Sequence, residues 1–346
     1  LVGSEMCIRD RTLGVLALFV LMAYGQEKKF ALYSVAFYNM ENLFDTIHDE
    51  GKNDYEYLPN GTNQWNTMKY KAKLKNMSEI LSMLSTDKLP MGPAIIGVSE
   101  IENYRVLEDI LKQPALADRG YQYVHYEGAD QRGVDCAFFY NPKLFELTNS
   151  KLVPYVYIND TVHKTRGFLI ASGNIAGEKM HFIVNHWPSR AAASPARERA
   201  GEQVRAIKDS LLREDSAAKI VIMGDMNDDP MDKSMAVALG AKRKPADVGP
   251  TDLYNPWWDT LKKGYGTLMY KGKWNLFDQI VFTGNLLGTD RSTLKFYKHE
   301  IFRRDFMFQK EGKYKGYPKR TQAGGVWLNG YSDHLPTIIY LIKEVK

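Results

Sequence analysis

Short apolar runs recur along the chain and are separated by polar segments. Each run has the length of a β-strand and is too short for most helices. Several runs follow one another with only short connections, which favours sheets packed on each other over a doubly wound parallel sheet. The predicted strands are residues 30–38, 94–99, 121–126, 134–140, 167–173, 180–186, 219–224, 275–282 and 335–342.

Two amphipathic helices are predicted between these strands. In residues 67–84, apolar side chains recur at alternating steps of four and three, which places them on one face of a helix. Ser194 followed by Pro195 is typical of a helix start, and apolar residues at helical spacing follow. Strands that outnumber helices predict an α/β fold in which the helices lie outside the packed sheets.

The first 25 residues differ from the rest of the chain. Two arginines precede an apolar run at residues 13–23, and small residues suited to signal-peptidase cleavage precede Gln26. This run is shorter than the roughly 20 residues that span a bilayer, which argues against a membrane anchor. We expect residues 1–25 to be a cleaved leader and residues 26–346 to form one domain. The protein would then be exported, periplasmic or secreted, with no transmembrane segment after cleavage.

Composition narrows the class of protein. Hydrophobic residues make up 44% of the chain and charged residues 25%, a balance typical of globular rather than disordered proteins. The two cysteines are Cys7, in the leader, and Cys136, so the mature chain cannot form an internal disulfide. The absence of a Cys/His cluster argues against a structural zinc site.

Positive charge is concentrated near the C-terminus. The whole chain carries a formal net charge of +5, while residues 295–320 hold nine Lys and Arg residues against three Asp and Glu residues. Aromatic residues are interleaved with these charges, and basic residues combined with aromatic ones can follow phosphates and stack on bases. An edge strand followed by a solvated loop explains the same pattern at least as well.

Polar residues end six of the apolar segments. Taken singly, each has an ordinary explanation, because Asp and Asn are favoured in turns. Together they supply oxygen ligands for a Mg²⁺-like ion, imidazoles that handle protons and a carboxylate that activates water, as metal-assisted phosphoryl chemistry requires. These residues are Asn39, Glu41, Glu100, Asn185, His186, Asp225, Asn227, Asp278, Asp333 and His334.

Two arginines in the intervening loops are candidates for binding the phosphate oxygens. Arg132 lies in "DQRGVD" and Arg190 in "HWPSR". A guanidinium matches phosphate in a fork geometry, which favours this role slightly over that of a surface ion pair.

The order of these motifs resembles that of the endonuclease/exonuclease/phosphatase superfamily, the DNase I-like proteins. The shared features are an Asn near the end of the first strand (Asn39), a Glu after the second (Glu100), G-D-x-N at 224–227 and S-D-H at 332–334. The resemblance spans nearly the whole mature chain. It implies a four-layer α/β sandwich, with two mainly antiparallel or mixed β-sheets face to face and helices outside.

The resemblance also implies a role for each polar residue. Asp225 would orient or deprotonate the attacking water, and Asn227 would hold the phosphate. His334 would lie at the scissile phosphate with its tautomer fixed by Asp278, and His186 would stabilise or protonate the leaving oxygen. The implied ligands of Mg²⁺ or Mn²⁺, with Ca²⁺ as a further candidate, are Asn39, Glu41, Glu100 and Asp333.

The expected activity is hydrolysis of a phosphodiester that depends on a divalent metal. Fold does not settle the substrate. Export and the basic-aromatic segment favour nucleic acid, and a phospholipid, as in sphingomyelinases, or a small phosphoester is the alternative. A binding module that kept the fold and lost catalysis is a further hypothesis, which the intact set of carboxylates argues against. We expect a monomer without a stable protein partner.

Overall fold

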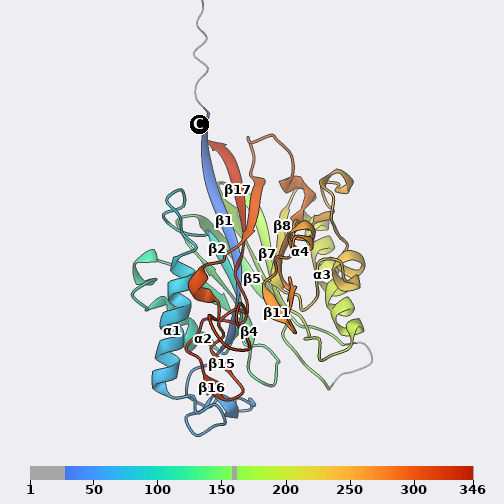
Figure 1. The fold of residues 1–346 in the computed structure, drawn as a ribbon. Coiled ribbons are helices and arrows are strands. Elements are labelled where there is room, and N and C mark those ends of the chain that lie inside the picture. Colours follow the sequence, from blue (N-terminus) through green and yellow to red (C-terminus); the bar gives the residue numbers. More distant parts are fainter. Residues whose placement is uncertain (1–27, 158–161, 346) are drawn as a thin grey trace, which may run out of the picture.

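The computed structural model describes residues 28–157 and 162–345. Two β-sheets lie face to face at its centre, and helices cover the outer faces (Figure 1). The predicted leader, residues 1–25, and its cleavage site lie outside the described residues. Within the described ranges, none of the helices combines the length and the apolar character needed to cross a membrane.

The first sheet has six strands in the order β14-β17-β1-β2-β4-β3. The long central strand β1 pairs antiparallel with β17 and parallel with β2, so the sheet is mixed. Its strands are β1 (Lys29–Leu43), β2 (Ile95–Ile101), β3 (Gln122–His125), β4 (Asp135–Tyr140), β14 (Lys295–Ile301) and β17 (Thr337–Val345).

The second sheet has seven strands in the order β5-β6-β7-β8-β13-β10-β9. At its centre, β8 pairs parallel with β7 and antiparallel with β13. Its strands are β5 (Phe145–Val153), β6 (Phe168–Ile175), β7 (Glu178–His186), β8 (Lys219–Asp225), β9 (Ala241–Lys242), β10 (Leu253–Tyr254) and β13 (Asp278–Thr283).

Helices and two small hairpins complete the described part of the chain. The α-helices are α1 (Thr67–Ser82), α2 (Tyr104–Leu111), α3 (Ser194–Glu214) and α4 (Trp258–Lys262). The hairpins pair β11 (Leu268–Tyr270) with β12 (Lys273–Asn275) and β15 (Gln322–Ala323) with β16 (Val326–Trp327). Single turns are η1 (Tyr55–Tyr57), η2 (Ala117–Arg119), η4 (Pro245–Asp247), η5 (Gly284–Leu286) and η6 (Asp305–Met307), and η3 (Ser234–Leu239) is a π-helix.

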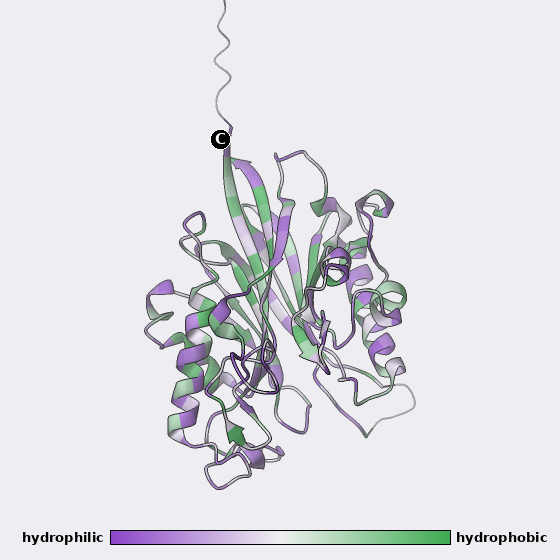
Figure 2. Ribbon diagram, in the orientation of Figure 1, coloured by the Kyte–Doolittle hydropathy of each residue, from purple (hydrophilic) through white to green (hydrophobic). Residues whose placement is uncertain are grey.

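Three apolar layers hold the fold together. One lies between the two sheets, where Phe138 of β4 packs against Phe182 of β7. The second joins α1 and α2 to the first sheet, and the third joins α3 to the second sheet. Figure 2 shows hydrophobic and hydrophilic residues mixed along α1 and α3, as expected of helices that bury one side only. The predicted four-layer α/β sandwich is therefore confirmed.

The predicted elements agree well with the observed ones. All nine predicted strands are present, as β1 to β4, β6 to β8, β13 and β17, and both predicted helices form as α1 and α3. The prediction missed β5, whose burial is patchy, the short helices α2 and α4, and the strands of two or three residues, β9 to β12, β15 and β16. Residues 295–301 form β14 at the edge of the first sheet, so the edge-strand interpretation of that part of the basic segment is confirmed.

Candidate active site

The strands that carry the predicted site residues end in unusual backbone. Glu41, Asn42, Glu100 and Asn227 have positive φ angles of 45°, 51°, 58° and 51°. Residues other than glycine adopt this conformation rarely, and it persists only where the surrounding structure imposes it. The pairing of β1 with β2 also shifts register between Asn39 and Leu43. These irregularities place strain where the polar side chains gather.

Three neighbouring strands of the second sheet place three site residues in a row. His186, the last residue of β7, is the register partner of Asp225, the last residue of β8. Asp225 is in turn the register partner of Asp278, the first residue of β13. Strand pairing alone therefore brings together residues that lie far apart in the sequence.

Asn39 joins this row to the first sheet. Its Nδ2 donates hydrogen bonds to Asp225 Oδ2 at 3.0 Å and to Glu100 Oε1 at 3.3 Å. Its Oδ1 accepts a hydrogen bond from the backbone N–H of Glu41 at 2.8 Å. Asn39 thus acts as a bridge between two carboxylates, and its predicted role as a metal ligand stays a prediction.

The Asp225 carboxylate is buried at the centre of the site. Its Oδ1 accepts a hydrogen bond from the backbone N–H of Asn227 at 2.9 Å, and the Asn227 side chain donates to the carbonyl of Trp187 at 3.0 Å. Burial raises the pKa of Asp225 to about 7, and the Asp278 and Glu100 carboxylates add to this rise against the opposing effect of His334. A carboxylate with a pKa near neutrality is well suited to accept a proton from water.

His334 is oriented by the residue predicted to do so. Its Nδ1 lies 2.7 Å from Asp278 Oδ2, and its Nε2 lies 3.8 Å from Asp225 Oδ2. Ser332 fixes the backbone beneath it by accepting from the His334 N–H at 3.0 Å and donating to the Asn39 carbonyl at 2.8 Å. Burial alone would lower the pKa of His334, but the Asp278 and Asp225 carboxylates hold it well above its usual value.

His186 has the opposite electrostatic character. Its Nε2 lies 3.7 Å from both Glu100 Oε1 and Asp225 Oδ2. Burial, reinforced by Arg166 and Arg132, lowers the pKa of His186 well below its usual value. The pKa of one imidazole is therefore raised and that of the other lowered at the same site, and such a separation of pKa values is typical of divided acid–base roles.

Glu100 is the most accessible member of the cluster. Its side chain is 16% exposed, and its Oε2 accepts a hydrogen bond from the backbone N–H of Asn42 at 3.0 Å. Ligand atoms of Glu100, His186 and Asp225 all lie within 4.8 Å of one another. Mg²⁺ is typically held by one or two carboxylates, water and substrate phosphate, so the accessible Glu100 carboxylate fits such an ion.

Glu41 and Asp333 belong to a second network, which adjoins the first because Asp333 Oδ1 lies 4.0 Å from His334 Nε2. Arg320 lies between them, with Nε 2.7 Å from Glu41 Oε1 and Nη2 3.0 Å from Asp333 Oδ2. Glu41 also accepts a hydrogen bond from the backbone N–H of Thr321 at 2.7 Å. Burial and Asp333 raise the pKa of Glu41 to about 7, and the buried Lys73 and Arg320 oppose the rise.

This network engages both predicted metal ligands. Among the described residues, neither Glu41 nor Asp333 belongs to a cluster of three ligand atoms close enough to share an ion. The Arg320 guanidinium contacts both carboxylates, and their role as metal ligands stays a prediction. In the sequence, Arg320 is recognisable only as part of the basic segment, because its neighbouring residues do not indicate that it pairs with Glu41.

Arginines near the site differ in how closely protein acceptors surround them. Arg132 is half-exposed, with Nε 3.5 Å from Asp130 Oδ1, so it can still reach a substrate. The buried Arg166, which the sequence did not single out, donates to Asp130 Oδ2 and to the Trp187 carbonyl, both at 2.9 Å. It therefore fixes the loop that supports His186 and contributes positive charge there.

Arg190 is held by the loop that follows Asp225. It donates to the Asn227 carbonyl at 3.1 Å, to Asp229 Oδ2 at 3.2 Å and to Asp232 Oδ2 at 2.8 Å. Its guanidinium also lies 4.5 Å from the ring centroid of Phe277. These acceptors hold Arg190 against the loop while its side chain stays 41% exposed, and the predicted phosphate contact stays a prediction.

The Arg190→Ala substitution is expected to destabilise the protein modestly. It leaves neighbouring carboxylates without their shared cation, at a cost of about 1 kcal/mol because the pair is partly exposed. Thermal melts of Arg190→Ala and of the control Arg213→Ala, which changes an α3 arginine outside this loop, measure the effect. A raised KM with an unchanged Tm would restore the phosphate-binding role.

Comparison with family models gives a match over most of the chain. A model described as the Endonuclease/Exonuclease/phosphatase family matches residues 34–343. Among curated proteins, no sequence match is found.

Several solved structures share the fold. TDP2 from D. rerio, complexed with single strand DNA product, has a TM-score of 0.54 and 14% identity over 90% of this chain and 98% of its own. The human Nocturnin catalytic domain with bound sulfate has a TM-score of 0.53 and 14% identity, covering 92% and 98%. A mannosyl-6-phosphatase from Bacteroides thetaiotaomicron has a TM-score of 0.55 and 14% identity, covering 89% and 99%. At these identities the likeness is one of fold.

Proposed function

Because the chain belongs to the Endonuclease/Exonuclease/phosphatase family, we propose that it is a divalent-metal-dependent phosphodiester hydrolase that cleaves nucleic acid. The observation that carries this proposal is the convergence of Glu100, Asp225 and the hydrogen-bonded pair of Asp278 and His334 at one end of the sandwich. Each of these groups meets a different requirement of phosphoester hydrolysis.

Glu100 would hold a Mg²⁺ or Mn²⁺ ion together with water and substrate phosphate. The bound ion supplies positive charge to the phosphate oxygens and orients the substrate. Glu100 suits this role because its carboxylate is the one that reaches the opening of the cluster. The Asn39 amide holds the Glu100 and Asp225 carboxylates in place by donating a hydrogen bond to each.

The remaining groups divide the proton chemistry. Asp225 accepts a proton from the water that attacks phosphorus, as its raised pKa permits. His334, kept cationic by Asp278, donates a hydrogen bond from Nε2 to a phosphate oxygen and stabilises the charge that builds there. The neutral His186 donates a hydrogen bond to the leaving oxygen as its bond to phosphorus breaks.

A basic groove near this site supports nucleic acid as the substrate. The groove, of about 400 Å³, is lined by Arg304, Lys310 and Lys315 together with an aromatic side chain, Phe308. Positive charge beside an aromatic face suits a single-stranded nucleic acid.

The groove lies one hairpin away from the candidate catalytic residues. Arg303, at its edge, stacks on Trp274 of β12 with 4.8 Å between the guanidinium carbon and the ring centroid. The paired strand β11 forms a β-bridge from Leu268 to His334. The basic segment is divided, however, because Lys295 lies at the far end of β14, paired with Ile342.

The direct test is hydrolysis by the purified protein. With Mg²⁺ or Mn²⁺ present, we expect cleavage of single-stranded DNA or RNA and of bis-p-nitrophenyl phosphate. Sphingomyelin and hexose phosphates serve as the competing substrates. Turnover of either in preference to nucleic acid would overturn the substrate assignment, and no turnover of any phosphoester would overturn the proposed reaction.

Neutralising the groove is expected to weaken nucleic-acid binding. The combined substitutions Arg304→Gln, Lys310→Gln and Lys315→Gln should lower the slope of log affinity against log salt by about 2, since each phosphate contact on a single strand contributes roughly 0.7. Turnover of bis-p-nitrophenyl phosphate should stay unchanged. Lys295→Gln is the matched control, because it removes the same kind of charge at the far end of β14. An equal salt slope in the triple variant and the control would refute the groove as the binding surface.

A further inference from the structure

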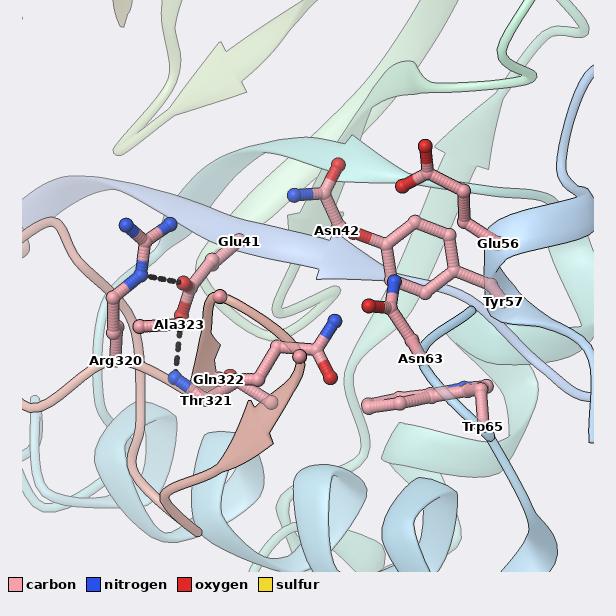
Figure 3. Close-up of a pocket in the computed structure, with 12 residues that line it drawn as sticks. Glu41, Asn42, Glu56, Tyr57, Asn63, Trp65, Arg320, Thr321, Gln322 and Ala323 are labelled. Carbon is pink, nitrogen blue, oxygen red and sulfur yellow. Dashed lines mark hydrogen bonds and ion pairs between the residues drawn. The ribbon is translucent and has the colours of Figure 1, made fainter. Parts of the chain in front are cut away.

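A small polar pocket opens beside the candidate active site. It has a volume of about 190 Å³ and lies between η1 with the loop after it and the β15–β16 hairpin. Figure 3 shows Asn63 and Gln322 reaching toward the middle of the pocket from opposite walls, with Tyr57 and Asn42 above them. None of these four side chains takes part in the proposed hydrolysis.

Two contacts tie this pocket to the site of hydrolysis. The backbone N–H of Asn42, on one wall, donates to Glu100 Oε2 at 3.0 Å. Arg320, on another wall, contacts Asp333 Oδ2 at 3.0 Å, and Asp333 precedes His334 in the chain. A phosphate held between Glu100 and His334 would therefore have the pocket next to it.

Three primary amides in the pocket lack a hydrogen-bond partner among the described residues. Within the described ranges, the side chains of Asn42, Asn63 and Gln322 make none of the protein hydrogen bonds found, and Gln322 Oε1 is buried without one. An unpaired polar atom away from water is costly, so its retention calls for an explanation. Amides that face a common space, each with a donor and an acceptor, can recognise a ligand with both kinds of group on its rim.

An aromatic ring forms another wall of the pocket. The Tyr57 ring stacks on Phe44 with 4.2 Å between centroids, and Trp65 meets its edge at 5.7 Å. Trp65 is fixed in turn by a hydrogen bond from Nε1 to the Phe44 carbonyl at 2.9 Å. The ring is thus held rigidly, so a flat ligand can stack against its remaining surface at little cost in side-chain entropy.

We propose that this pocket binds the nucleobase next to the scissile phosphate, an inference that rests on the proposed function. Side-chain amides match the paired donors and acceptors on the edge of a base, and an aromatic ring matches its face. The pocket is smaller than the roughly 300–1,000 Å³ of sites for drug-sized ligands, which suits a single base. Asn63 and Gln322 read the base edge, and Tyr57 carries the stacking.

Binding measured without turnover tests the pocket directly. In a His334→Ala background with Mg²⁺, dAMP and dCMP are titrated by calorimetry against 2-deoxyribose 5-phosphate, which has the sugar and phosphate but no base. We expect at least one nucleotide to bind about tenfold more tightly than 2-deoxyribose 5-phosphate, or better still. Stacking and hydrogen bonding of one base contribute a free energy of about that size. Adding Asn63→Ala and Gln322→Ala should abolish this preference. Adding Asn149→Ala, which removes an exposed amide on β5, should leave it intact.

Activity measurements provide a second test of the pocket. In the otherwise wild-type protein, Asn63→Ala with Gln322→Ala should lower kcat/KM on a single-stranded oligonucleotide about tenfold and leave bis-p-nitrophenyl phosphate unchanged. Folding is not expected to suffer, because neither side chain has a hydrogen bond to lose. Equal affinities for nucleotide and sugar phosphate, or a hexose phosphate bound more tightly than either nucleotide, would overturn the base assignment. Hydrolysis of bis-p-nitrophenyl phosphate without that of any oligonucleotide would instead reject the proposed function.

Discussion

The His334→Ala substitution is expected to lower kcat by about 10²–10⁴, the range typical of a positioned acid–base group. The imidazole is buried, carboxylates raise its pKa against the effect of burial, and its Nε2 lies 3.8 Å from the Asp225 carboxylate that would activate water. Its loss removes a donor to the phosphate while leaving Glu100 to bind the ion. Initial rates on bis-p-nitrophenyl phosphate and on an oligonucleotide should fall together, because both substrates share the phosphorus centre.

Asp278 should act through His334. It is fully buried and accepts from His334 Nδ1 at 2.7 Å, so Asp278→Asn disturbs both the tautomer and the charge of the imidazole. Residues that act as a unit show strongly non-additive effects. We therefore expect the double variant to be little slower than His334→Ala alone.

Thermal melts decide whether these losses are catalytic. The matched control is His181→Ala, which removes a buried histidine of β7 that lies 2.7 Å from Ser172 Oγ, away from the site. It should lower Tm and keep kcat. Additive rate losses in the double-mutant cycle, or rate losses accounted for by unfolding at the assay temperature, would contradict the pairing of Asp278 with His334.

The second large effect is expected at Glu100. Glu100→Gln keeps the shape of the side chain and removes the charge that attracts a divalent ion. The affinity for Mn²⁺, measured by calorimetry, should fall by more than the roughly 10–100-fold that the loss of an outer-sphere partner costs. Excess chelator should abolish the activity of the wild-type protein.

Glu41→Gln is the matched control for this substitution. Glu41 is also a buried carboxylate on the same edge of the first sheet, but Arg320 already balances its charge. Mn²⁺ affinity should therefore change much less than in Glu100→Gln. If Glu41→Gln proved the more damaging of the two, the ion would belong between Glu41 and Asp333, and full activity in excess chelator would end the metal mechanism altogether.

Much of the fold could be predicted from the sequence because its signals are local. Apolar runs bounded by turn residues located the strands that build both sheets, and the helical spacing of apolar side chains located α1 and α3. The polar residues at strand ends located the candidate site, because the same chain positions that end a strand also lie at the edge of a sheet. Patchy patterns, such as that of β5, gave no comparable signal.

The contacts that side chains make in and around the site could not be predicted in the same way. Lys73 lies within the predicted helix 67–84 and looks like one more solvated lysine, yet it is fully buried and donates to the Tyr331 carbonyl at 2.6 Å. Nothing in the sequence around Arg190 shows that its guanidinium hydrogen-bonds Asp229 and Asp232 of the Asp225 loop.

The sequence by itself determined the layers of the sandwich and the identity of the residues at its active end. Only the tertiary structure decided which of them act together. Glu100 meets Asp225 through Asn39, whereas Glu41 meets Arg320, 279 residues away in the chain. Side-chain periodicity is a property of neighbouring residues and is visible in the sequence. Charge pairing between distant segments depends on how those segments pack, and local sequence patterns do not reveal it.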